Sequence, residues 1–153
     1  MGNTLDLCDA VLTFSEKGKK VKLVPRNDEE AKALVLDGCV FQDKLARCDG
    51  MFLLRSGNKK VIILVELKGA HDIPHAFEQL AYVQKYREEY RLIVDRFRKD
   101  GTGQLVEKAF IISNGMLSKP DREREEKKHG IRVREVLHCE ATSPVPDLRL
   151  DLF

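Results

Sequence analysis

Short apolar runs separated by clusters of charge dominate the chain, and two of these runs predict paired strands. Residues 51–54 and 61–67 are joined by residues 55–60, whose central Ser-Gly-Asn is typical of a turn. The unbroken apolar stretch at 61–65 indicates a strand that is buried on both faces and covered by helices. These runs predict an antiparallel pair of strands at the centre of a sheet.

The rest of the pattern alternates between periods typical of strands and of helices. Two β-rich runs at 11–14 and 21–24 flank a charged turn and predict a hairpin. Asn27 can cap a helix, acids follow it and Gly38 can end it, so a helix is predicted over residues 28–37. The further predicted elements are a short strand at 40–42, a long helix from 74 to about 99 that breaks near Tyr90, a strand at 105–113, a charged helix at 119–129 ended by Gly130, and a strand at 131–137.

This order of elements predicts a mixed α/β fold in which a sheet is sandwiched between helices. A chain of 153 residues is long enough to bury one core, and it contains no repeat or low-complexity tract. We therefore expect one domain, with its core over about residues 27–137 and an irregular tail over about residues 140–153.

Charge alone leaves the partner open. A formal net charge of +2 is too small to indicate nucleic-acid binding by itself, although phosphate contacts need only a local basic surface. Each basic cluster taken singly is typical of a solvated turn or helix face. The clusters are Lys17, Lys19, Lys20 and Lys22, then Arg55, Lys59 and Lys60, then Lys85, Arg87 and Arg91.

The cysteines and the apolar runs bear on the cellular compartment. Cys8, Cys39, Cys48 and Cys139 form no C-x-x-C pair, so we expect no structural zinc and four reduced, mostly buried thiols. The longest apolar run is too short to span a bilayer, and no basic segment precedes an apolar signal region. A cytoplasmic location without membrane attachment is therefore expected.

Charged residues at the end of the buried run are the strongest functional signal. Glu66 and Lys68 lie two residues apart, so a strand points both side chains to one face and Leu67 to the other. Asp49 begins the partner strand and reaches the same end of the sheet. Charges beside a buried run are paired, metal-bound or open to a cleft, so a simple ion pair remains an alternative. The combination of three charged residues favours a functional site.

The spacing Glu-x-Lys has little specificity by itself, because Glu30, Glu125 and Glu126 also begin such triplets. Those three fall on predicted helices, where residues two apart face different directions, whereas Glu66 ends an apolar strand. Two carboxylates suit Mg²⁺ or Mn²⁺, which can activate water and neutralise charge that develops on phosphorus. A neighbouring lysine can hold the attacking water or stabilise the phosphate, so the set predicts hydrolysis of a phosphodiester.

The motifs Asp49-Gly-Met-Phe and Val-Glu66-Leu-Lys68-Gly, followed by Gln79 on the next predicted helix, resemble the PD-(D/E)xK nuclease superfamily over about residues 27–114. The resemblance implies a restriction-endonuclease-like fold with a helix, three strands, a helix and another strand. It also implies that the Asp and the Glu bind metal and that the Lys assists catalysis. We accordingly expect Asp49, Glu66, Lys68 and Gln79 as catalytic residues, and Asp49, Glu66 and Leu67 as metal ligands.

The helix around Gln79 departs from the superfamily pattern in one position. It resembles the corresponding helix of RecB-like members, but Val83 stands where their Gln-x-x-x-Tyr spacing has tyrosine. Tyr82 or Tyr86 can take that place on the same face of the helix. Cys48 likewise stands where the superfamily's name has proline.

Three further residues have both functional and ordinary explanations. Some superfamily members place a metal-binding acid on the first helix, and Glu30 is the expected ligand there, although a solvent-facing acid in a first turn explains it equally well. His71 and His75 flank the start of the long helix, where a surface role is the stronger explanation. The histidines therefore stay outside the expected site.

The expected function is that of a metal-dependent endonuclease acting on nucleic acid, with DNA favoured over RNA. One small site cuts one strand, so cleavage of a duplex would require a symmetric homodimer. A non-catalytic nucleic-acid-binding or assembly module that keeps the fold is the main alternative. A phosphoester hydrolase acting on nucleotides is another, although the absence of a Gly-rich phosphate loop disfavours an NTPase.

Overall fold

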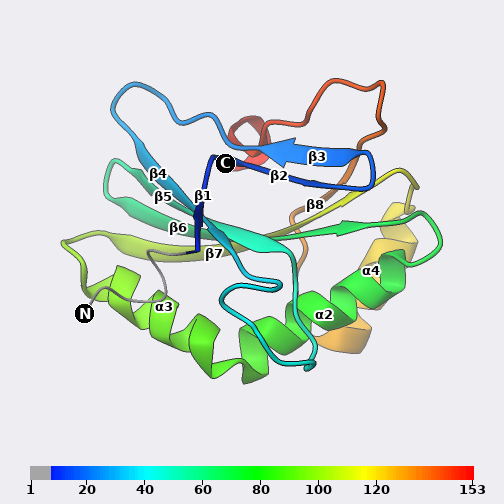
Figure 1. Cartoon of the computed structure of the whole chain (residues 1–153), viewed down its shortest axis with the longest axis horizontal. Helices are drawn as coiled ribbons and strands as arrows, with labels where there is room; N and C mark the ends of the chain where they lie inside the picture. Colours follow the sequence, from blue (N-terminus) through cyan, green and yellow to red (C-terminus); the bar gives the residue numbers. More distant parts are fainter. Residues whose placement is uncertain (1–7) are drawn as a thin grey trace.

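A mixed six-stranded sheet forms the middle of the computed structural model, which describes residues 8–153 (Figure 1). In spatial order its strands are β1 (Asp9–Ala10), β4 (Glu30–Val35), β5 (Gly50–Ser56), β6 (Lys59–Lys68), β7 (Gln104–Ser113) and β8 (Glu135–His138). The first four strands pair antiparallel, whereas β6, β7 and β8 run parallel. The predicted α/β class is confirmed, and the predicted antiparallel pair corresponds to β5 and β6.

Within the described residues, the α-helices cover one face of this sheet. That face carries α2 (Ile73–Tyr86), α3 (Glu88–Lys99) and α4 (Lys119–His129) (Figure 1). The other face carries the hairpin of β2 (Thr13–Glu16) and β3 (Lys19–Lys22) together with the 3-10 helix η1 (Leu148–Asp151). The expected sandwich of helices is therefore wrong, because the hairpin and the C-terminal segment supply the second apolar layer, in which Leu148 and Leu152 are fully buried.

Strand β6 is buried on both faces, as predicted. Leu64 belongs to the core under the helices, and Val65 belongs to the core under the hairpin. The same alternation continues past the apolar run, so Glu66 and Lys68 point toward the helices and Leu67 points toward the hairpin. The sheet thereby presents two charged side chains on its helix-covered face, at the carboxyl end of β6.

The helix predicted over residues 28–37 is wrong, because this segment contains strand β4. Asn27 and Asp28 lie in a turn in which the Glu29 N–H donates to the Arg26 carbonyl oxygen. Strand β4 pairs with β1 on one side and with β5 on the other. Pairing with two neighbours outweighs the capping signal and the helix-forming residues of the segment.

The long helix predicted from residue 74 is in fact two helices. Arg87 has an extended backbone that ends α2, and α3 begins at the next residue, shortly before the break expected near Tyr90. The predicted hairpin, the strand at β7 and the helix α4 with Gly130 at its end are confirmed. Strand β8 begins at Glu135, later than predicted.

Residues 36–48 form a loop between β4 and β5, and no strand is present at 40–42. The β-pairing of Phe41 is limited to one isolated bridge to Asp37. Cys39 in this loop forms a disulfide with Cys8, whose carbonyl oxygen accepts from the N–H of Val35 at 2.9 Å. The expectation of four reduced thiols is therefore wrong, since strand pairing brings together two cysteines 31 residues apart in the sequence.

The other two cysteines, Cys48 and Cys139, are free and buried, as expected. Within residues 8–153, no helix has the length and apolar character needed to cross a membrane. The N-terminal end, where no signal region is predicted, lies partly outside the described residues.

Candidate metal and catalytic site

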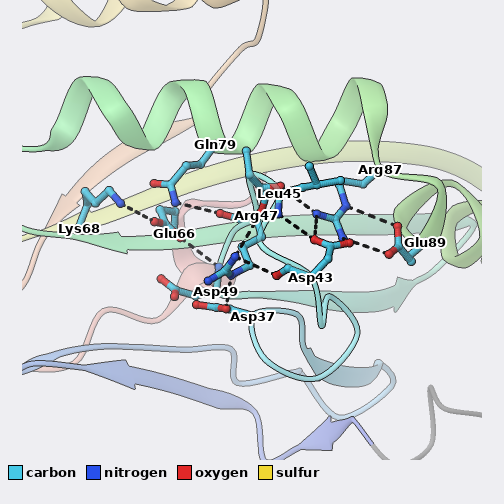
Figure 2. Close-up of polar contacts among 11 residues, drawn as sticks. Asp37, Asp43, Leu45, Arg47, Asp49, Glu66, Lys68, Gln79, Arg87 and Glu89 are labelled. Carbon is cyan, nitrogen blue, oxygen red and sulfur yellow. Dashed lines mark hydrogen bonds and ion pairs between the residues drawn. The ribbon is translucent and has the colours of Figure 1, made fainter.

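Asp49 and Glu66 meet where β5 begins and β6 ends. Gly50 pairs with Val65, so Asp49 and Glu66 face each other one position further along the two strands. The Asp49 N–H donates to Glu66 Oε1 at 3.0 Å (Figure 2). The Leu67 N–H donates to Asp49 Oδ2 at 2.7 Å. Each carboxyl group is therefore held by the main chain of the neighbouring strand, and the two groups lie side by side.

Lys68 completes this cluster. Its Nζ lies 3.1 Å from Glu66 Oε2, and the two side chains are 17% and 4% exposed, respectively. Because Glu66 is nearly buried whereas Lys68 still reaches solvent, the cluster opens toward the end of the strand. The structure thus brings together the three charged residues that the sequence singled out, Asp49, Glu66 and Lys68, which we call the acidic cluster.

Burial changes the protonation of the two carboxyl groups. It raises the pKa of Glu66 well above the ordinary range of a glutamate, and the charge of Asp49 raises it further, whereas Lys68 lowers it. Burial also raises the pKa of Asp49, against hydrogen bonds from Glu66 and Leu67. With no cation bound, the pair keeps a shared proton at a pH at which exposed carboxylates are ionised.

The thiol next to this pair is inert. Cys48 is buried, and its burial raises the pKa of the thiol well above the ordinary range, with a further contribution from Glu66 and Asp49. A thiol that stays protonated is neither a nucleophile nor a metal ligand. The chemistry of the site therefore rests on its oxygen and amine groups.

Gln79 on α2 faces the acidic cluster. Its Nε2 donates to the main-chain oxygen of Arg47 at 3.0 Å, while its Oε1 is buried and accepts no hydrogen bond from residues 8–153. Figure 2 shows this oxygen on the side of Glu66 and Lys68. A buried acceptor without a donor costs free energy, so this position suits a bound molecule that can donate a hydrogen bond.

Within residues 8–153, Glu30, His71 and His75 form no hydrogen bond or ion pair with the three residues of the cluster. The segment of Glu30 is a strand rather than the expected helix. Glu30 is exposed and lies opposite Arg55 in the β4–β5 ladder, at the end of β4 that is far from Asp49. His71 and His75 are exposed near the start of α2, and His75 faces Glu78. The structure thus separates Glu30 from the expected metal ligands.

Leu67 can contribute only main-chain atoms, since its side chain is buried in the core under the hairpin. In a strand, the N–H and the C=O of one residue point to the same side. The Leu67 N–H points to Asp49, so the Leu67 carbonyl oxygen faces the same side as the carboxylates. The site can therefore offer a third oxygen.

These oxygen atoms fit a hard divalent cation that keeps much of its hydration. Within residues 8–153, no group of three or more His, Cys, Asp or Glu side chains is placed to hold a metal ion. Mg²⁺ is commonly bound through one or two carboxylates and several waters, which Asp49, Glu66 and the Leu67 carbonyl can satisfy once Glu66 is ionised. A closed zinc site with Cys or His ligands does not fit this set.

An arginine that the sequence grouped with solvated basic residues fixes the loop of residues 36–48. Arg87 is 2% exposed, and its guanidinium donates to both carboxylate oxygens of Asp43 at 2.9 Å (Figure 2). It also donates to the Ala46 carbonyl at 3.3 Å and lies 4.1 Å from the centre of the Phe41 ring. The local sequence pattern gives no signal for this contact, because Asp43 and Arg87 are 44 residues apart.

The basic residues of the turn between β5 and β6 lie away from the acidic cluster. The turn between β5 and β6 is at the end of these strands opposite the acidic cluster. Arg55 pairs there with Asp100 at 2.5 Å, and Lys60 is 1% exposed, with its Nζ bonded to two carbonyls at the end of α3. These side chains therefore do not supply phosphate contacts at the cluster.

Comparison of the chain with protein-family models, with curated proteins and with solved structures finds no match. The functional argument therefore rests on the chemistry and the geometry of the acidic cluster.

Proposed function

We propose that this chain is a Mg²⁺- or Mn²⁺-dependent nuclease that hydrolyses phosphodiester bonds of nucleic acid, with DNA favoured over RNA. One observation carries the proposal. Asp49, Glu66 and Lys68, from the facing ends of two neighbouring strands, meet in one nearly buried cluster that opens at Lys68. Such a cluster of oxygen donors beside a lysine suits phosphodiester hydrolysis.

The order of the elements around the cluster supports the proposal. Strands β4, β5 and β6 form an antiparallel meander, the helices α2 and α3 follow, and β7 then pairs parallel to β6. The superfamily resemblance implies this order of three strands, a helix and a strand. The first helix of that pattern is the part that is missing between residue 8 and β4.

The residues of the cluster have distinct roles in the proposed reaction. Asp49 and Glu66 bind the cation, which when bound lowers the pKa of a coordinated water and neutralises charge on the phosphate. Lys68 reaches solvent next to Glu66, so its ammonium group can orient the attacking water and stabilise the negative charge that develops on phosphorus. Gln79 Oε1 is an unused acceptor that can fix a water in place.

Conservative variants of the cluster test this proposal. Asp49→Asn and Glu66→Gln keep the shape of each side chain but remove a negative ligand, so we expect cleavage to fall at least about a hundredfold while nucleic-acid binding persists. Lys68→Ala should lower turnover far more than affinity. Cleavage of single-stranded, duplex and branched DNA and of RNA is measured with Mg²⁺ and with Mn²⁺, and Glu30→Gln serves as the matched control.

A non-catalytic module is the competing proposal, and one observation favours it. Lys68 and Glu66 already form an ion pair, which is the structural explanation of the same residues. Under that explanation the three variants change mainly thermal stability, because a broken pair leaves one charge unmatched. Wild-type protein that binds no divalent cation, with variants that lose only stability, would refute the nuclease proposal.

A further inference from the structure

Tyr82 and Tyr86 form an exposed pair of aromatic rings on α2. Their ring centroids are 5.2 Å apart, and the ring planes are tilted by 50°. Tyr86 is 71% exposed, and Tyr82 is partly buried beside it. The pair therefore exposes the ring of Tyr86 to solvent, and the ring of Tyr82 lies against it.

The pair continues the surface that starts at the acidic cluster. Tyr82 and Tyr86 follow Gln79 by three and seven residues, so all three lie along one side of the helix. The ring of Tyr86 is displaced from Gln79 by about 10 Å along the helix axis. The loop of residues 36–48 borders this side, since Arg47 contacts Gln79 and Asp43 contacts Arg87, the residue after Tyr86.

Basic residues flank the aromatic pair. Lys85 is exposed and bonds only to the neutral carbonyl of His129, at 2.7 Å, on the side of α4. Lys44 is exposed in the bordering loop, and within residues 8–153 neither lysine is ion-paired with a carboxylate. Two acids beside the pair, Asp43 and Glu89, are both bound by Arg87. The surface around the rings therefore suits a negatively charged chain.

We propose that Tyr86, supported by Tyr82, stacks on an unpaired base of a nucleic-acid strand whose backbone then runs to Lys68. This inference rests on the proposed function and names its substrate class, which is single-stranded nucleic acid or the unpaired part of a branched one. Stacked nucleotides rise by about 3.4 Å each, so roughly three of them span the 10 Å between Tyr86 and Gln79. A base within a duplex is covered on both faces and cannot reach the ring.

Tyrosine fluorescence gives a direct measurement of this contact. The protein has three tyrosines and no tryptophan. The third tyrosine, Tyr90, is 3% exposed, and its hydroxyl donates to Glu107 at 2.5 Å, so a strand cannot stack on it. A short oligothymidine strand of about ten nucleotides, titrated in a buffer with a chelator so that no cleavage occurs, should quench the emission of Tyr82 and Tyr86.

The variants separate stacking from general binding. Tyr86→Ala should weaken binding of the strand by about five- to a hundredfold, because stacking of one base contributes about 1–3 kcal/mol. Tyr86→Phe keeps the ring and should bind like the wild type. Leu92→Ala removes another exposed apolar side chain, 59% exposed on α3, and should have no effect. A duplex of the same length should bind weakly, and wild type and Tyr86→Ala should bind it with equal affinity.

Each other outcome overturns the inference. An unquenched emission, equal affinity of Tyr86→Ala and wild type, or a duplex that depends on Tyr86 as strongly as the strand contradicts stacking on an unpaired base. The proposed function fails separately. If the protein binds the strand in a way that depends on Tyr86 but does not cleave it in Mg²⁺ or Mn²⁺, the stacking proposal stands and the nuclease proposal is refuted. If the protein cleaves nucleic acid and Tyr86→Ala has no effect, the nuclease proposal stands and the stacking proposal is refuted.

Discussion

The surroundings of Glu66 oppose its ionisation. It is 3% exposed and lies against a second carboxyl group, although a single lysine is only 3.1 Å away. Burying two acids beside one base destabilises the ionised form of the pair, and an apolar residue at this position would avoid the cost. Acids with strongly perturbed pKa values are typical of sites that bind a cation or transfer a proton. The conflict at Glu66 therefore supports a functional explanation.

The raised pKa of Glu66 predicts an unusual dependence of stability on pH. In the unfolded chain Glu66 ionises near its ordinary value of 4.5, whereas the folded protein holds the proton to higher pH. An acid with a raised folded pKa makes the free energy of unfolding fall as pH rises above that ordinary value. Glu66→Gln cannot ionise, so we expect it to become more stable than wild type as pH rises from about 5 to 8.

Denaturant unfolding at several pH values, in a buffer with a chelator, measures this difference. Glu78→Gln is a suitable control, since the Glu78 side chain is 61% exposed. Unfolding free energies of wild type and Glu66→Gln that run parallel over the whole pH range would contradict a protonated Glu66. If Glu66→Gln gains stability and also loses cleavage, the loss of cleavage is not caused by unfolding.

At the scale of elements, the sequence predicts those parts that depend on local pattern. Alternation in β6 places Glu66 and Lys68 on one face, and the turn at residues 55–60 returns the chain so that Asp49 faces Glu66. The sequence predicts a helix around Glu30 because the capping and helix-forming residues there satisfy local rules, whereas the two strand partners of this segment are distant in sequence. Local sequence patterns do not predict pairing with strands that are distant in the sequence.

The contact of Arg87 with loop 36–48 depends even more on long-range structure. Asp43 and Arg87 are 44 residues apart, and only the packing of α2 against the sheet brings them together. The local pattern predicts that Arg87 is solvated, although its side chain is 2% exposed in the structure. The Cys8–Cys39 disulfide is likewise not predicted from the sequence, because its two cysteines are 31 residues apart.

Removing Arg87 should loosen the loop that leads into the site. The guanidinium makes several charge-assisted bonds and covers the Phe41 ring, so we expect Arg87→Ala to lower the free energy of unfolding by about 2–4 kcal/mol. Arg87→Lys keeps the charge but lacks the planar fork and should lose an intermediate amount. Chemical denaturation measures both losses, and hydrogen exchange of residues 36–48 reports the loop directly.

Arg98→Ala is the matched control for Arg87. Arg98 is 59% exposed and pairs with Asp95 one turn earlier on α3, so its loss should cost less than about 0.5 kcal/mol. Equal losses for the two variants, or unchanged exchange of the loop in Arg87→Ala, would show that Arg87 does not fix the loop.

At the scale of the whole molecule, the two ends of the described chain close the face of the sheet that the helices leave open. Phe14 of the hairpin packs against Phe52 of β5 with ring centroids 4.9 Å apart, and its ring leaves no room for a side chain at Gly50. Leu148 and Leu152 belong to the same core. Segments that look peripheral in the sequence thus complete the support of β5 and β6, the strands that carry the acidic cluster.

An ion pair between Glu29 and Arg149 joins the C-terminal segment to the start of β4. Arg149 Nε donates to Glu29 Oε1 at 2.9 Å, and the two side chains are 11% and 3% exposed, respectively. The hydrogen bond from Arg149 is the largest cause that lowers the pKa of Glu29 from 4.5 to about 2, and Ser56 adds another hydrogen bond. The contact is therefore sensitive to acid.

The lowered pKa of Glu29 predicts a loss of stability in acid. A carboxyl group whose folded pKa is below its unfolded value stabilises the fold at pH above 4.5, and this contribution disappears as pH falls toward 2. The difference corresponds to about 3 kcal/mol. We expect Glu29→Gln to be less stable than wild type at neutral pH and to lose less on acidification, whereas Glu30→Gln, changed at the exposed neighbouring position, should follow the wild type. Urea unfolding between neutral pH and pH 2 measures these differences, and a Glu29→Gln profile that parallels the wild type would show that the ion pair with Arg149 does not contribute to stability.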